Sequence, residues 1–530
     1  MLLKRVLLAT VVLTALVLTS FVITPSKRSE AKTGGPDSYG YRYIDSRDPE
    51  PKIPFIWIDA TNGTDTGMNG DDTYVTINLP FSFPYYGKQY TRIYPSSNGL
   101  IGLEYATTQW WNRNIPTTSP RGILAVYWDD LWVYSSYGHK VYYMFGGTAP
   151  NRWVVIEWYH VCNLGYSGSS YEYTFEAILY ESGLIVFSYY DTDTSASWYN
   201  NGASATVGIN SPDGRTGVRY LYNSGTLKSG TTIMFSEKII QIEDYSYELQ
   251  EQEERVAYAM YKPYRFSVTV SSETYKNVES IHLTLGPGYE EVKVKWTFDG
   301  TSWNFQEEYD PFDFISLDPS RCTATHDAKH WTVHFYIYFT FNYPLEDYRG
   351  FSLIAWGKGA IPGMAGETAA YRVERNLEFV GNPVVVGEVN GELSNGDWVQ
   401  GGEVVTFTGV KVVYEGTTLS PPNNAFSVSV VDERGNYYTD RTSSGREANI
   451  DVLMPLERVD KTFEFVITDV PPDVQLTHFI PFTLRVDPMP PVSPTWFYIH
   501  AESYMDENTE YDNDPYVYLT WSSGVDYESG

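Results

Sequence analysis

The apolar residues of this chain follow the period of β-strands almost throughout, and this pattern constrains the fold more than any other feature. From residue 39 onward, runs of strand length are separated by clusters of Gly, Pro, Asn and Asp, with almost no helical periodicity. Residues 174–180 and 184–190 are two such runs, and the short loop between them ends in Gly183. A Gly in that position is typical of an antiparallel hairpin. The sequence therefore predicts an all-β chain of tandem antiparallel β-sandwich domains.

The composition agrees with this prediction and excludes several kinds of partner. Aromatic residues make up 16% of the 530 residues, a content that favours strands over disorder. The net charge of −29 argues against a nucleic-acid partner, because phosphate binding requires clustered Lys and Arg, and against docking on anionic lipid headgroups. Two cysteines are too few for a disulfide-dense scaffold.

The N-terminus has the layout of an export signal. Lys4 and Arg5 precede an apolar run over residues 6–24, and Ser29 and Ala31 supply the small residues of a cleavage site. Residues 1–31 are therefore predicted to be a signal peptide or, if they are not cleaved, an N-terminal anchor and the chain's membrane contact. Either way, we expect an extracellular or cell-surface location.

Changes in composition divide the rest of the chain. A first sandwich is predicted over residues 38–237, and two more, immunoglobulin-like or fibronectin type III-like, over 262–382 and 383–490. Residues 238–261 are rich in Glu and Gln, and from 241 onward they contain neither Gly nor Pro, so they are predicted to form a linker that can adopt a short helix. Residues 491–530 follow a proline-rich spacer.

Specific strings in the first region carry a family resemblance. They include residues 79–87 (LPFSFPYYG), 96–99 (SSNG), 125–131 (AVYWDDL) and 150–158 (PNRWVVIEW). The region resembles the nidogen-like β-sandwich of secreted and surface proteins of bacteria and archaea, and the corresponding module of plexin-domain-containing proteins. The remainder is similar to the immunoglobulin-like and fibronectin type III-like modules of archaeal surface proteins, and residues 491–530 look like the start of a truncated fibronectin type III-like module.

A search for catalytic motifs is negative. The sequence contains no G-x-S-x-G nucleophile elbow, no H-E-x-x-H, no Walker A loop and no G-x-G-x-x-G. Cys322, His326, His330 and His334 are spaced by four, but they lie in or near a strand-like run that would spread them apart, which favours a polar strand edge over a metal site. The sequence therefore predicts no enzyme and no catalytic residue.

Paired acids are the weak candidates for a metal site. Carboxylates in loops are ligands that Ca²⁺ prefers, but none of these pairs has the spacing of an EF-hand, and solvated turns explain them equally well in so acidic a chain. Apart from calcium, no cofactor is predicted. The candidates are Asp71, Asp72, Asp129, Asp130, Asp191 and Asp193.

Three further features bear on contacts and modification. Trp110 and Trp111 fall in a predicted loop and are candidates for stacking on a sugar ring. Cys162 and Cys322 fall in different predicted domains, and they are either bridged by a disulfide, which an exported protein permits, or buried as thiols. Asn62 begins an N-x-[ST] sequon in a predicted loop, where it is a candidate for N-glycosylation.

Two functions fit these observations. The first is a non-enzymatic extracellular structural or adhesion protein of a prokaryote, more specifically an archaeon, that contacts other cell-surface proteins or glycans through loops on rigid sandwiches. The alternative is the accessory binding region of a secreted hydrolase whose catalytic domain lies beyond residue 530. Nidogen-like modules are shared with such enzymes, so the resemblance leaves both functions open.

Overall fold

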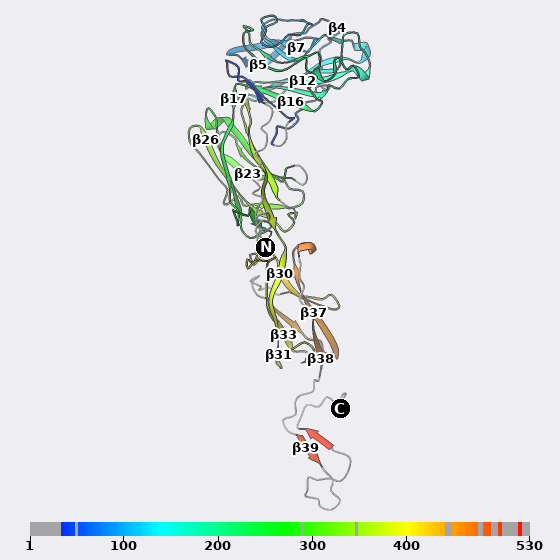
Figure 1. Cartoon of the computed structure of the whole chain (residues 1–530), viewed down its shortest axis with the longest axis vertical. Helices are drawn as coiled ribbons and strands as arrows, with labels where there is room; N and C mark the ends of the chain where they lie inside the picture. Colours follow the sequence, from blue (N-terminus) through cyan, green and yellow to red (C-terminus); the bar gives the residue numbers. More distant parts are fainter. Residues whose placement is uncertain are drawn as a thin grey trace, which may run out of the picture.

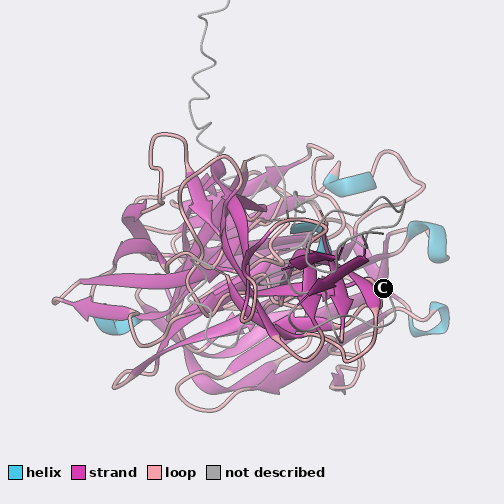
Figure 2. Cartoon of the chain, turned by 90° about the horizontal axis from the view of Figure 1, so that it is seen from below, coloured by secondary structure: helices cyan, strands magenta, loops and turns pink. Residues whose placement is uncertain are grey.

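The computed structural model describes residues 33–47, 51–287, 291–344, 348–439, 448–474 and 481–488, together with the backbone of two later strands, β39 (Phe497–His500) and β40 (Tyr518–Trp521). Strands dominate these residues, and their helices are single 3-10 turns (Figure 2). Most strand pairs are antiparallel and form three successive sandwiches, as the sequence predicts (Figure 1). The predicted signal segment lies outside the described residues, as does most of the predicted truncated module. In the described part, no helix is long and apolar enough to cross a bilayer.

The first sandwich packs a ten-stranded sheet against a six-stranded one. The larger sheet runs in the order β1 (Thr33–Gly34), β2 (Arg42–Asp45), β16 (Thr231–Ser236), β13 (Ile185–Asp191), β12 (Tyr173–Tyr180), β11 (Trp153–Asn163), β10 (Lys140–Gly146), β3 (Thr64–Asp65), with β9 (Leu131–Val133) on β11 and β4 (Gly70–Asp71) on β9. The smaller sheet runs in the order β15 (Gly217–Tyr222), β14 (Thr206–Asn210), β8 (Ile123–Trp128), β7 (Leu100–Gly102), β6 (Lys88–Pro95), β5 (Ile77–Tyr85). Loops of the first sandwich contain three 3-10 turns, η1 (Ser135–Tyr137), η2 (Ser169–Tyr171) and η3 (Asn200–Gly202).

Alternating burial explains why the resembling strings form this sandwich. Along β5 the odd-numbered residues, from Ile77 to Tyr85, are buried between the sheets while most of their neighbours face outward. β12 and β13 pair as the sequence predicts, and Gly183 between them has φ of 94°, a conformation that favours Gly. The core is strongly aromatic, with Trp158 and Phe175 stacked at a centroid distance of 5.1 Å.

The second sandwich begins earlier than the sequence predicts. One sheet is β18 (Gln241–Tyr247), β20 (Tyr264–Ser271), β26 (His330–Phe339), β24 (Ile315–Leu317), with β25 (Thr323–His326) on β26. The other is β19 (Val256–Tyr258), β29 (Gly363–Glu374), β27 (Arg349–Gly357), β21 (Val278–Leu285), β22 (Val292–Phe298), β23 (Trp303–Tyr309), with η4 (Tyr275–Asn277) before β21. A short pair, β17 (Lys238–Ile239) and β28 (Ala360–Ile361), joins it to the first sandwich.

The prediction that residues 238–261 form a linker able to adopt a short helix is therefore wrong. β18 pairs antiparallel with β20, and β19 pairs parallel with β29. Tyr245 and Tyr247 pack edge-on against Phe351 of the facing sheet, at centroid distances of 5.7 and 5.4 Å. Cross-sandwich burial of these rings outweighs the weak helix propensity of the surrounding Glu and Gln residues.

The third sandwich is the smallest. Its sheets are β31 (Gly391–Leu393), β30 (Leu377–Gly387), β33 (Val404–Tyr414), β36 (Asn449–Leu453) and β32 (Trp398–Gln400), β38 (Phe482–Asp487), β37 (Val459–Thr468), β34 (Ser427–Asp432), β35 (Tyr437–Thr439), with η5 (Pro472–Val474) after β37.

The boundary between the second and third sandwiches also differs from the predicted one. The sequence places it at residues 382/383, where Gly381, Asn382 and Pro383 interrupt the pattern. In the structure these residues form an irregularity inside β30, between the positions that pair with Val410 and Thr408 of β33. The sandwiches meet instead at Arg375 and Asn376, the two residues between β29 and β30.

Candidate functional site

Loops of the first sandwich bring four of the predicted acids together with the predicted tryptophan pair. β4 pairs with β9, so Asp71 lies opposite Trp132, and Asp129 and Asp130 form the turn that leads from β8 into β9. β4 and β7 lie at the top of Figure 1, whereas β16 and β17 lie toward the second sandwich. We call this region, formed by residues 70–74, 96–99, 104–114 and 129–131, the acidic loop cluster.

Asn98 holds the acidic loop cluster together. Its side-chain Nδ2 donates to Asp72 Oδ1 at 2.7 Å and to the Thr108 carbonyl at 3.0 Å, and its Oδ1 accepts from the Leu131 amide at 2.9 Å. Asn98 is fully buried, so each of these bonds satisfies a polar atom that water cannot reach. Gly99 follows with φ of 66°, and a Cβ there would lie 2.0 Å from the Tyr127 carbonyl oxygen. The string SSNG is therefore a structural hub for three loops.

Burial and neighbouring charge raise the pKa of acids in the cluster. Burial raises the pKa of Asp129, although its carboxylate accepts bonds from Ser204 and Asn163. Burial, together with the charges of Asp71, Asp72 and Asp129, raises the pKa of Asp130 to about 6. Crowded carboxylates of this kind create a negative local potential that attracts cations.

The structure does not join these acids into a formed metal site. Within the described ranges, no group of three or more His, Cys, Asp or Glu side chains is arranged to hold a metal ion. Asp191 and Asp193 make separate contacts, since Asp191 Oδ1 accepts from the Ser229 hydroxyl at 3.3 Å and from the Asp193 amide at 3.0 Å. The calcium site therefore stays a prediction from sequence.

Trp110 and Trp111 are exposed on a loop that is held in place. Their side chains are 45% and 61% exposed, and their rings meet edge-on at 5.4 Å. The buried Trp128 donates its indole N–H to the Gln109 carbonyl at 2.7 Å, and Asn112 Nδ2 donates to Asn223 Oδ1 at 2.7 Å. Since bonds anchor the loop on both sides of the pair, the two rings are presented in a fixed position, which suits stacking on a ligand.

Of the two alternatives that the sequence leaves open for the cysteines, the structure has the buried thiols and not the disulfide. Both are free and buried, Cys162 in β11 of the first sandwich and Cys322 before β25 of the second. Burial raises the pKa of the Cys162 thiol to about 12 and that of Cys322 to about 11, so both are poor nucleophiles. They act as small apolar side chains in the cores of separate domains.

The other predicted positions lie apart from the acidic loop cluster. Asn62 is exposed in a turn before β3, where its sequon is accessible. His326 stacks on Tyr275 at 3.8 Å, while His334 bonds Ser267 across β26 and β20, so the four-spaced Cys and His residues do not converge. Their strand placement is the one that the sequence favours.

A pair of buried acids escaped the sequence reasoning. Glu157 and Glu176 lie opposite each other on β11 and β12, and each is at most 2% exposed. They accept backbone bonds from residues 53–60, which we call the strap: the Ala60 amide bonds Glu157 Oε2 at 2.8 Å and the Ile58 amide bonds Glu176 Oε1 at 3.1 Å. Burial raises the pKa of Glu157 to about 7 and that of Glu176 to about 9. The sequence signal that could have found this pair is an acidic residue inside each of two otherwise apolar strand runs.

The fold and the site define a class of protein. It is a chain of tandem β-sandwiches whose first sandwich carries a cluster of acidic and aromatic loops. Residues 53–244 match a family model described as "NIDO related", which agrees with the nidogen-like resemblance of the first sandwich. No curated protein matches the chain.

The solved structures that match this chain share little sequence with it. Tandem immunoglobulin repeats of Dlar are 11% identical, cover 46% of this chain and 97% of their own, and superpose with a TM-score of 0.12. A Bacteroides ovatus mixed-linkage glucan utilization locus protein, SGBP-B, in complex with a heptasaccharide is 10% identical over 87% of this chain and 74% of its own (TM-score 0.14). An Antarctic bacterial Ca²⁺-stabilized adhesin that binds ice is 10% identical over 86% of this chain and its whole length (TM-score 0.19). Likeness at this level carries no functional argument.

Proposed function

We propose that this chain is a non-enzymatic surface protein of a prokaryotic cell, more specifically an archaeal one, that is exported through its N-terminal segment. Its β-sandwiches form a stiff rod that carries the acidic loop cluster at one end, where it contacts other surface proteins or glycans. The observation that carries the proposal is that buried contacts fasten each described sandwich to the next. A rod without flexible joints suits a structural or adhesive role, because it keeps a binding surface at a fixed distance from its attachment.

The first joint combines a strand pair with an apolar contact. β17 pairs parallel with β28, and the Ser236 hydroxyl donates to the Gly359 carbonyl at 2.6 Å. The outer face of the ten-stranded sheet contributes Val186 and Met234 to an apolar cluster that includes Ile361 of the second sandwich. Rotation at this joint would expose these buried side chains to water, at a cost of about 25 cal/mol per Å².

The second joint is shorter and also contains buried side chains. Only two residues separate β29 from β30, and one of them, Arg375, donates to the Phe341 carbonyl at 3.0 Å and pairs with Asp473 at 2.6 Å. Tyr414 of the third sandwich donates its hydroxyl to the Ala259 carbonyl and packs on Tyr258 at 4.8 Å. The cores of the second and third sandwiches form one continuous apolar cluster across this joint. The joint therefore resists bending as a domain core does.

The exposed tryptophan pair is the feature of the loops best suited to adhesion. Aromatic side chains dominate the energy of protein interfaces and also stack on sugar rings. The pair lies on a fixed loop, so binding through it costs little conformational entropy. The acids beside it favour partners that carry positive charge or bridging cations.

Deletion and complementation in the cells that produce the chain test the proposal. Antibodies should label the chain on intact cells, and deleting its gene should reduce adhesion to other cells or to a coated surface. Complementation with the Trp110→Ala/Trp111→Ala double variant should fail to restore adhesion, whereas Trp303→Ala, which removes a tryptophan that is 44% exposed on the second sandwich, should restore it. Labelling that requires permeabilised cells, or adhesion unaffected by deletion, would contradict the proposal.

A further inference from the structure

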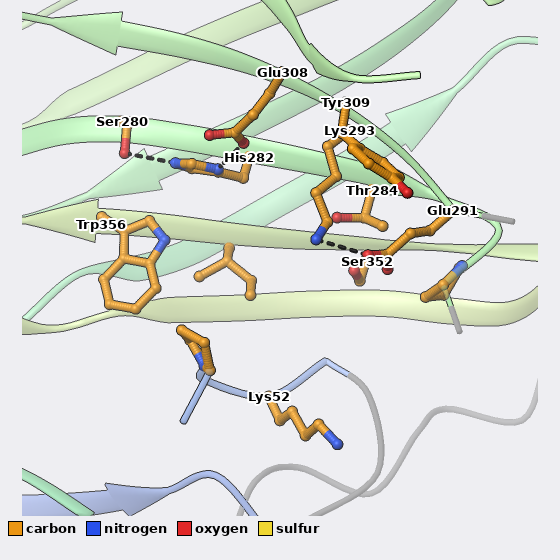
Figure 3. A pocket seen from close by; sticks show the side chains of 13 residues that line it. Lys52, Ser280, His282, Thr284, Glu291, Lys293, Glu308, Tyr309, Ser352 and Trp356 are labelled. Atoms are coloured by element: carbon orange, nitrogen blue, oxygen red, sulfur yellow. Dashed lines mark hydrogen bonds and ion pairs between the residues drawn. The ribbon is translucent and has the colours of Figure 1, made fainter. Parts of the chain in front are cut away.

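A second candidate binding site lies where the first and second sandwiches meet. An open pocket of about 730 Å³ lies between the outer face of β21, β22, β23 and β27 and the residues Lys52 and Pro54, where the chain enters the strap (Figure 3). This volume is in the range of pockets that take small organic ligands, about 300–1,000 Å³. The pocket is separate from the acidic loop cluster, since none of the loops of the cluster lines it.

The polar lining of the pocket follows from strand alternation. Along β21, Ile281 and Leu283 point into the core of the second sandwich, whereas Ser280, His282 and Thr284 line the pocket. Figure 3 shows these side chains on the strand above the pocket and Lys52 on the opposite side. The sheet therefore offers a row of hydrogen-bonding groups to any molecule held beneath it.

The charged groups of this face are already paired with one another. Lys293 lies 2.7 Å from Glu291, and Glu308 accepts from Lys295 at 2.9 Å. Glu308 also bonds His282 Nδ1 at 2.9 Å, and burial lowers the pKa of His282, so this imidazole is neutral at pH 7. A charged ligand would have to compete with these pairs, whereas a neutral ligand can add hydrogen bonds to them without breaking any.

An aromatic surface completes the pocket. Trp356 of β27 is half-buried and lies beside Ile354, and Tyr309 stands at the other end of the lining (Figure 3). The C–H faces of a sugar ring are weakly positive and pack on the negative face of an indole, while the hydroxyl groups bond to surrounding polar side chains. Paired charges, hydroxyl and imidazole groups, and an indole face form a combination that matches this chemistry.

We propose that this pocket binds a neutral oligosaccharide, with Trp356 packing on one sugar ring and Ser280, His282 and the Lys293–Glu291 pair bonding its hydroxyl groups. The proposal rests on the proposed non-enzymatic binding role and assigns it a ligand class and a second site. The ligand would contact both sandwiches, because the pocket is lined from both sides.

Glycan binding by the purified full chain tests the proposal. An array of neutral hexose oligosaccharides of two to six units, with sulfated and sialylated counterparts, identifies binders, and titration calorimetry measures their affinity. The neutral set should bind in preference to the acidic one. Trp356→Ala should weaken binding about fivefold, the loss expected for one aromatic stacking contact of about 1 kcal/mol.

Matched variants separate the two sites and control for folding. Because Trp356 also packs against the apolar cluster of the first joint, His282→Phe provides a second test with a ring of similar size. It should weaken binding and lower the thermal unfolding temperature only slightly, because Glu308 loses its bond to His282 but keeps the one to Lys295. Trp303→Ala should bind as the wild type does, and Trp110→Ala/Trp111→Ala reports separately on the acidic loop cluster. Loss of binding only in the Trp110/Trp111 variant would overturn the pocket site while supporting the proposed function. Preference for acidic glycans, or no binding at all, would overturn the pocket proposal, and the adhesion assay would then decide the proposed function separately.

Discussion

The buried pair Glu157 and Glu176 predicts that the first sandwich loses stability as the pH rises. The raised pKa values mean that the folded state holds protons that the unfolded chain releases. For an acid with a raised pKa, the stabilising contribution is complete below the unfolded value of 4.5 and is lost as the pH rises toward the folded value, here about 7 for Glu157 and about 9 for Glu176. The sensitive window therefore runs from about pH 4.5 to pH 9.

The substitution Glu176→Gln isolates this effect. Gln keeps the shape of the protonated acid, and its Oε1 can still accept the bond from the Ile58 amide, but it cannot ionise in the unfolded chain. In the folded state Glu176 is still protonated at pH 7, which is about 2.5 pH units above the pKa of the same side chain in the unfolded chain. Holding this proton lowers the free energy of unfolding by about 3 kcal/mol. The variant should therefore gain about 3 kcal/mol relative to the wild type between pH 4 and pH 7.

Hydrogen exchange in increasing urea, read by mass spectrometry, measures this difference in the full chain. Peptides from β11 and β12 report the unfolding free energy of the first sandwich separately from the other two. Glu181→Gln is the matched control, because the hydrogen bond from Arg152 lowers the pKa of the Glu181 carboxylate. Replacing Glu181 should therefore give no gain in unfolding free energy over the wild type as the pH rises. A difference between Glu176→Gln and the wild type that is constant from pH 4 to pH 7 would refute the reasoning.

Four further outcomes follow from the sequence and the structure. Leu13→Arg/Leu16→Arg should block export, because each charge costs about 3 kcal/mol in an apolar segment, and fractionation of cells producing the variant checks this. Asn98→Ala should cost about 1–3 kcal/mol by leaving the buried Leu131 amide unsatisfied and should raise amide exchange in residues 104–114, whereas the exposed Asn304→Ala should change neither. Tyr414→Ala should raise amide exchange at the ends of β29 and β30 relative to the wild type. Equal exchange in the variant and the wild type would show that this residue does not hold the second joint. Native mass spectrometry after maleimide treatment should find Cys162 and Cys322 unlabelled until the chain is unfolded, and a mass about 2 Da lower, from the loss of two hydrogen atoms in one disulfide, would contradict the free thiols.

The local pattern of the sequence was sufficient wherever short-range geometry decides the structure. The hairpin closed by Gly183 needs only two strand-like runs with a residue of positive φ between them. The string SSNG likewise contains its own explanation, since Asn98 and Gly99 fix a turn that other side chains cannot make. The all-β fold follows from many such local decisions.

Long-range contacts account for what the sequence could not predict. Residues 241–247 look helical when taken alone, and only the distant Phe351 provides the partner that makes them a strand. Spacing likewise says nothing about whether Cys162 and Cys322 meet. The pairing of Glu157 with Glu176 depends on strand register, which a single sequence does not specify.

Distances between spin labels on neighbouring sandwiches test the stiff rod most directly. Labels at Lys228→Cys and Asn304→Cys span the first joint, and labels at Asn304→Cys and Glu392→Cys span the second; all three positions are exposed, and the native thiols are too buried to react. Double electron–electron resonance on the full chain should give one narrow distance distribution for each pair of labels. Tyr414→Ala should broaden only the distribution that spans the second joint. Broad distributions in the unmodified joints would show that the sandwiches move independently and would contradict the account.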